Sequence, residues 1–175
     1  MSATAASLFV AVQDDIVYVR VVGRATFACG PDFSSLVEGL IAKGHKRFAI
    51  DMKECPLMDS TFIGLLTGFG MQLPPGDDCG LSIHQMSPRV ADLLTNLGVS
   101  QLFLTCPNAD RIPSDLNATP AETPGRSHDE IQQTCLKAHQ TLMEANPENI
   151  ARFKDVTKFL EEDLKRSKEA KSRND

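Results

Sequence analysis

Short apolar runs alternate with segments of helical periodicity between residues 8 and 104, and this alternation restricts the fold more than any other feature. The first two runs follow each other directly, whereas each later run comes after a helical segment. Strands that alternate with helices are usually parallel with right-handed crossovers, while two successive strands pair as an antiparallel hairpin. The pattern predicts an α/β fold in which helices pack against a mixed β-sheet. The expected strands are 8–12, 16–22, 47–52, 80–84 and 102–104.

Residues at the start of two helical segments indicate where these helices begin. Asp59 or Ser60 can cap the helix that follows the third strand, because a side-chain oxygen at this position accepts from a free backbone N–H group. Ser87 followed by Pro88 is typical of the first positions of a helix. We therefore expect helices to begin near residues 60 and 88.

The distribution of charge divides the chain into a core domain, a linker and a charged extension. Residues 1–111 carry 8 basic and 11 acidic side chains, whereas residues 128–175 carry 9 basic and 10 acidic ones. The stretch 112–127 between them is rich in Pro, Ser and Thr, which is typical of a linker. Within the extension, we expect a helical hairpin at 128–167 and a disordered tail at 168–175.

The extension contains two amphipathic segments separated by Asn146 and Pro147. Ser127 and Glu130 form the sequence pattern of a capping box, which predicts the start of the first helix. Each segment has an apolar face, and that face must be buried. It can pack on the core domain, on a second copy of the chain as a homodimer, or on another protein.

Composition excludes several classes of protein. The net charge of −5 argues against nucleic-acid binding, which needs a basic surface. No apolar run approaches the roughly 18 residues of a membrane helix, and the N-terminus does not resemble a signal peptide. The five cysteines are odd in number and lack a C-x-x-C spacing, so we expect neither disulfides nor a zinc site. These features favour a cytoplasmic protein without a metal or cofactor, a membrane or a nucleic-acid partner.

The chain also lacks the motifs of common enzymes. Asp51 and Asp59 are candidates for an acid–base pair, but the first ends a strand and the second precedes a helix, so structural roles explain both. Gly64 and Gly68 lie four residues apart without a nearby Lys, which argues against a phosphate-binding loop. We expect these glycines to let the helix approach the sheet closely. The sequence therefore predicts no catalytic residues and no enzymatic activity.

One segment carries a resemblance to a known family. Asp51 closes a strand, Met58-Asp59-Ser60-Thr61 opens a helix, and Ile63-Gly64-Leu65-Leu66 continues it. This run resembles the signature of STAS domains, the anti-sigma factor antagonist family, and the segment 94–103 resembles a second motif of that family. The resemblance covers about residues 7–106, and the order of predicted strands and helices agrees with it.

The resemblance implies a function by protein binding. Antagonists of this family bind an anti-sigma factor that is itself a serine/threonine kinase; phosphorylation at the helix start breaks the complex, and a phosphatase restores it. Position in the motif implies Thr61 as the phosphate acceptor, with Ser60 as the alternative. The implied partner-binding residues are Asp59, Ser60, Thr61, Phe62, Ile63 and Phe27.

Other interpretations of the same residues stay open. Ser60 and Thr61 also fit a role as helix caps without any modification. The domain can instead be a STAS-fold scaffold or a transporter accessory protein, which regulates by protein binding without a sigma factor. A small enzyme or ligand-binding domain is the third possibility, although the sequence offers no convergent set of titratable residues for it.

Overall fold

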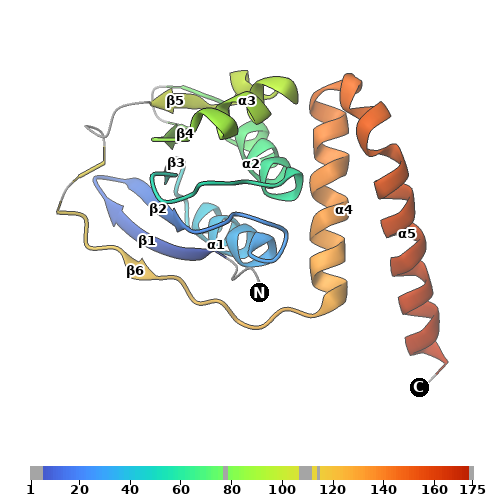
Figure 1. Ribbon diagram of the computed structural model, residues 1–175. Coiled ribbons are helices and arrows are strands. Elements are labelled where there is room, and N and C mark those ends of the chain that lie inside the picture. The colour runs from blue at the N-terminus through green and yellow to red at the C-terminus, as the bar shows by residue number, and fades with distance from the viewer. Residues whose placement is uncertain (1–5, 77–78, 107–111, 114, 174–175) are drawn as a thin grey trace.

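The computed structural model describes residues 6–76, 79–106, 112–113 and 115–173. Its centre is a six-stranded sheet with the strand order β5-β4-β3-β2-β1-β6 (Figure 1). The mixed sheet and the helices packed against it confirm the predicted fold class. The strands are β1 Ser7–Gln13, β2 Ile16–Val22, β3 Arg47–Asp51, β4 Gly80–His84, β5 Leu104–Cys106 and β6 Thr119–Pro120.

Strand direction follows the sequence pattern. β1 and β2 form an antiparallel hairpin, and both Asp14 and Asp15 in its turn have a positive φ, as in two-residue turns that match the twist of the strands. β2, β3, β4 and β5 are parallel neighbours. The helices α1 Gly30–Ala42, α2 Ser60–Gln72 and α3 Pro88–Asn96 connect these parallel strands.

The core lies between the sheet and the helices. Alternate residues of the central strands, such as Val17, Val19, Phe48, Ile50 and Ile83, are fully buried and belong to one apolar cluster. Each belongs to the face of its strand that the helices cover, because side chains of a strand alternate between the two faces of a sheet. This packing fixes the position of α2, which carries the candidate site.

The predicted linker contributes a strand to the sheet. β6 pairs antiparallel with β1, and the N–H of Ala121 donates to the carbonyl of Leu8 at 2.8 Å. Pro120 can occupy this strand because β6 lies at the edge of the sheet, where an absent N–H group costs no ladder bond. The expected strand at 102–104 is shifted: residues 100–102 form a 3-10 turn, and β5 begins at Leu104.

The extension forms two long helices that pack on the domain. α4 His128–Ala145 lies against α2 and α1, and α5 Ile150–Ser172 lies on the far side of α4 (Figure 1). The 3-10 turn Pro147–Asn149 joins them. α5 continues past residue 167, where we expected the tail to begin, with Glu162 and Arg166 paired one turn apart on it. None of the helices in the described residues is long and apolar enough to span a membrane.

The two glycines of α2 face α4 and not the sheet, which corrects the sequence-based expectation. An ideal Cβ on Gly64 would lie 2.7 Å from the carbonyl carbon of Ala138, and one on Gly68 would lie 3.6 Å from Cγ2 of Thr141. Periodicity places the two glycines on one face of the helix, but it does not reveal which neighbour covers that face. The close approach at Gly64 brings α4 over the first turns of α2.

Candidate functional site

The start of α2 is fixed by the carboxylate of Asp59. Its Oδ1 accepts from the N–H of Phe62 at 2.9 Å, which confirms Asp59 as the N-cap, and its Oδ2 accepts from the N–H of Phe27 at 2.7 Å. The N–H of Asp59 donates to the carbonyl of Ala25 at 3.0 Å. One side chain therefore caps the helix and holds the loop that carries Phe27 beside it.

Ser60 is half-buried and bonded to the extension. Its Oγ lies 2.9 Å from Nε2 of His139 on α4, and Nδ1 of His139 lies 2.8 Å from the carbonyl oxygen of Cys135. A carbonyl only accepts, so Nδ1 carries a proton, and burial lowers the pKa of His139, which favours the neutral ring. In that tautomer Nε2 accepts, and the hydroxyl of Ser60 donates to it.

Thr61 is more deeply covered than its neighbour. The residue is 4% exposed, and its Oγ1 donates to Sγ of Cys135 over 3.6 Å. Burial raises the pKa of the Cys135 thiol, and the nearby charge of Asp59 acts in the same direction, so the thiol is protonated at neutral pH. The hydroxyl that the family resemblance implies as phosphate acceptor therefore lies beneath α4.

The other predicted partner-binding residues divide into exposed and buried ones. Phe27 is 51% exposed beside the start of α2. Phe62 is fully buried, with its ring centre 4.5 Å from that of Phe33, and Ile63 is buried in the same cluster. In this arrangement, Phe27 and Ser60 offer surface at the helix start, whereas Phe62 and Ile63 support it from within the core.

The sequence did not indicate that Cys135 and His139 contact this site. They lie 74 and 79 residues from their partners Thr61 and Ser60. The available signal was their spacing of four residues on a helix, which places both on one face. The sequence did not reveal that this face rests on α2.

Asp51, the other carboxylate considered for acid–base chemistry, also has structural partners. Oδ2 of Asp51 lies 3.0 Å from Nε of Arg20, and its Oδ1 accepts from the N–H of Lys53 at 3.1 Å. Asp59 is engaged by two backbone N–H groups, as described above. Both acids are therefore explained by the stability of the strand end and the helix start.

Comparisons with known proteins bear on the family and the fold of this chain. The family model "STAS domain" matches residues 8–112. A crystal structure of an anti-sigma factor antagonist from Mycobacterium paratuberculosis is similar with a TM-score of 0.53 and 17% identity, over 61% of this chain and 89% of that one. The structure of the Bacillus cell fate determinant SpoIIAA in its phosphorylated form has a TM-score of 0.49 and 16% identity, over 61% and 96% of the two chains.

The search of curated proteins finds no match to this chain. At 17% identity, the similarity to the Mycobacterium structure shows a shared fold and nothing more specific. The family model is the stronger finding, because it matches more than half of the chain and includes both sequence motifs and the whole of α2. The chain therefore belongs to the STAS domain family.

Proposed function

We propose that this protein is an anti-sigma factor antagonist whose binding is switched by phosphorylation at the start of α2. Its partner would be an anti-sigma factor with serine/threonine kinase activity, and a phosphatase would reset the switch. The observation that carries the proposal is the Asp59-capped helix start, where Ser60 and Thr61 lie beside the exposed Phe27. The family match and the antagonist described from Mycobacterium support the choice of partner.

Physical chemistry favours a phosphate switch at this place. The first turn of a helix has free N–H groups and a partial positive charge, so it tolerates a phosphate. The kinase would transfer the γ-phosphoryl group of ATP to a hydroxyl oxygen of Ser60 or Thr61, with loss of the hydroxyl proton and release of ADP. The modification adds a charge of about −1.5 to −2 next to Phe27, and a partner would have to dehydrate that charge.

The two hydroxyls have different support as acceptors. Thr61 holds the position that the family resemblance implies, whereas Ser60 is the more exposed of the two. Neither argument excludes the other residue. The proposal therefore covers both, and the experiment has to separate them.

The test is co-purification of the partner followed by phosphopeptide mass spectrometry. We expect the tagged protein to retain a protein with a kinase domain, and we expect this kinase to add one phosphate within residues 57–66. Thr61→Ala and Ser60→Ala identify the acceptor, and the variant without the acceptor should bind the partner yet escape release. Ser87→Ala is the control, because it removes a hydroxyl at the start of another helix, where Ser87 is the N-cap of α3. Absence of phosphate from residues 57–66 would refute the switch.

A scaffold or transporter accessory role is the second candidate. Val156 and Phe159 on α5 are 37% and 59% exposed, and they lie outside the residues that the family model matches. Exposed apolar side chains of this kind can bind another protein or a second copy of the chain. In that case, co-purification would yield a stable complex without a kinase, and Phe159→Ser would weaken it while Phe27→Ser would not.

A further inference from the structure

Helix α4 lies directly over the hydroxyl groups of the candidate site. Cys135 contacts Thr61, and His139 contacts Ser60. Ala138 lies between Cys135 and His139 on α4, and it approaches Gly64 of α2 so closely that no side chain would fit at position 64. The same stretch of α4 therefore packs on the first turns of α2 and covers Thr61.

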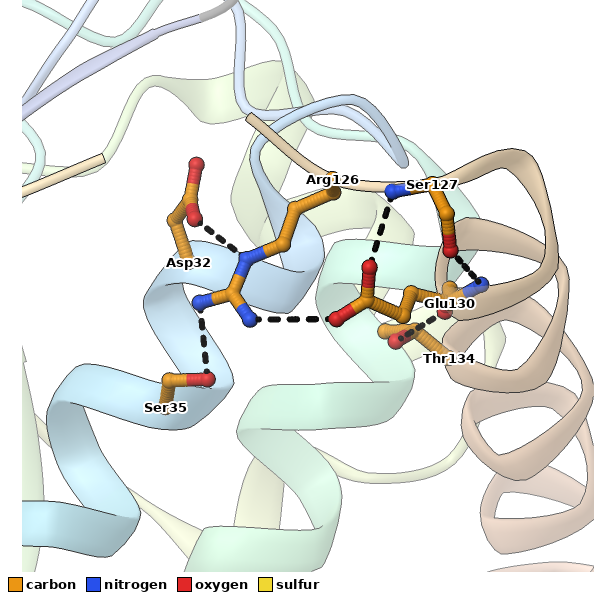
Figure 2. A network of polar contacts seen from close by, with 6 residues as sticks. All are labelled: Asp32, Ser35, Arg126, Ser127, Glu130 and Thr134. Carbon is orange, nitrogen blue, oxygen red and sulfur yellow. Dashed lines mark hydrogen bonds and ion pairs between the residues drawn. The ribbon is translucent and has the colours of Figure 1, made fainter. Parts of the chain in front are cut away.

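The beginning of α4 is attached to α1 through Arg126 (Figure 2). Its Nε lies 2.8 Å from Oδ1 of Asp32, one terminal nitrogen donates to Ser35 at 3.0 Å, and the other lies 3.4 Å from Glu130. Glu130 also closes the capping box with Ser127. A single guanidinium thus ties the last residues of the linker and the first turn of α4 to the core domain.

The far end of α4 is attached by two amides. Nδ2 of Asn146 and Nδ2 of Asn149 donate to the carbonyl of Leu97 at 3.2 and 2.9 Å, and Nδ2 of Asn149 also donates to the carbonyl of Leu142 at 2.9 Å. Polar contacts therefore hold α4 at both ends, Ala138 and Leu142 pack into the core between them, and the covered hydroxyl of Thr61 contacts this same stretch of the helix.

The apolar core cluster draws few of its buried members from α4 and α5. All buried members of the core cluster except Ala138 and Leu142 lie before residue 104. The sheet and the first three helices therefore supply most of the core by themselves. Because α4 packs mainly on the outer face of α2, it can open without separating the sheet from the first three helices, since local stability depends on local contacts.

We infer that α4 and α5 form a removable cover, and that Thr61 can be modified only when this cover leaves α2. This inference rests on the proposed function for its biological meaning. A phosphate on Thr61 has no room beside Cys135, so phosphorylation of Thr61 and docking of α4 exclude each other. Reciprocal coupling follows: whatever releases α4 exposes Thr61, and a phosphate on Thr61 holds α4 away.

Ser60 is different, because the residue is only half-buried, although its hydroxyl also contacts His139 of α4. A kinase can therefore act on Ser60 while the cover is in place, whereas action on Thr61 reports that the cover has opened. The extension would thus decide which of the two neighbouring hydroxyls is available.

The test measures access to position 61 without a kinase. Thr61→Cys, made together with Cys135→Ser in the full chain, places a thiol where the hydroxyl lies and removes its neighbouring thiol. Alkylation by N-ethylmaleimide is followed by peptide mass spectrometry. Cys55 is the internal reference, because it is 2% exposed and belongs to the apolar core cluster, so its reaction reports the opening of the core.

With the cover in place, we expect the introduced thiol to react slowly. Arg126→Ala should speed its alkylation by about tenfold relative to Cys55, the change expected from the loss of one charge-assisted hydrogen bond. Lys137→Ala is the matched control, because Lys137 also pairs α4 with α1, at 3.5 Å from Glu38, but is exposed. This control should leave the ratio unchanged.

Two results would overturn the inference. The first is rapid alkylation at position 61 in the protein with Arg126 intact, because it would mean that nothing covers this site. The second is a ratio to Cys55 that stays constant in both Arg126→Ala and Gly64→Ala, because position 61 would then open only with the whole domain. Since no kinase takes part, failure of the proposed function would leave this result unaffected.

Discussion

The two glycines of α2 allow one substitution to be tested in two environments. Gly64 and Gly68 lie one turn apart in the interior of the same helix and face the same neighbour, α4. Replacing either by Ala gains roughly 1 kcal/mol of helix propensity, because Gly loses more backbone entropy on folding. Any difference between the two variants therefore reports the contact that the new Cβ makes.

The distances predict opposite signs for the two substitutions. At Gly68, the new Cβ would lie 3.6 Å from Cγ2 of Thr141, which is ordinary contact. At Gly64, it would lie 2.7 Å from the carbonyl carbon of Ala138 and closer still to its carbonyl oxygen, so α4 must move by more than 0.7 Å to reach the 3.4 Å of ordinary contact. The obstacle is backbone and cannot rotate away, and overpacking of this kind costs about 1–3 kcal/mol.

We therefore expect Gly68→Ala to raise the free energy of unfolding by about 0.5–1 kcal/mol and Gly64→Ala to lower it by up to about 2 kcal/mol. Urea unfolding followed by far-UV circular dichroism measures both free energies. The values are comparable when the variants have the same slope m, the change in free energy of unfolding per molar urea. Gly39→Ala in α1 is the control, because no atom of the residues that the structure describes lies within 4 Å of an ideal Cβ at this position. If Gly64→Ala were as stable as Gly68→Ala, α4 would not pack on α2 as described.

Three further predictions concern single side chains around the site. Asp59→Ala should lower the free energy of unfolding by about 2 kcal/mol, because the N–H groups of Phe62 and Phe27 lose their acceptor, whereas Asp59→Asn should lose less; thermal denaturation compares them. Leu142→Ala should lower the free energy of unfolding in urea by about 2–5 kcal/mol, since Leu142 is fully buried where α4 packs on the core. A loss below about 1 kcal/mol would contradict this packing. Burial lowers the pKa of His139, so its contribution to stability is complete above about pH 6.5 and is lost as the pH falls through the lowered pKa. The wild type should therefore lose more stability than His139→Gln between pH 7.5 and 5.5, and equal losses would argue against a buried neutral imidazole.

Much of the fold could be predicted because local signals and topology agree. The caps Asp59 and Ser87 and the capping box of Ser127 begin their helices where the sequence indicates. Alternation between strands and helices then leaves few arrangements of the sheet. The strand β6 escaped prediction because its two residues, Thr119 and Pro120, owe their extended form to pairing with β1 and not to their own propensity.

The surroundings of the site could not be predicted in the same way. Sequence position identifies Ser60 and Thr61 as the first residues of a helix, but their exposure depends on α4, which follows about 70 residues later. The amphipathic pattern of α4 requires a partner surface without naming it. Gly64 is the clearest case. A glycine is needed there because the backbone of Ala138 approaches it closely, and no local sequence pattern indicates that contact.

The structure makes two adjacent hydroxyls chemically distinct, although the sequence motif treats them as alternatives. A charge added at Ser60 would lie within hydrogen-bond distance of an imidazole, and an anion beside His139 favours the imidazolium form that would balance it. A charge added at Thr61 would lie beside a protonated thiol, close to the negative Asp59 and beneath α4. A buried charge without a partner is unfavourable, so the charge at Thr61 favours the departure of α4, whereas the charge at Ser60 does not. The contacts of α4, and not the motif, therefore determine what a modification at each position does to the fold.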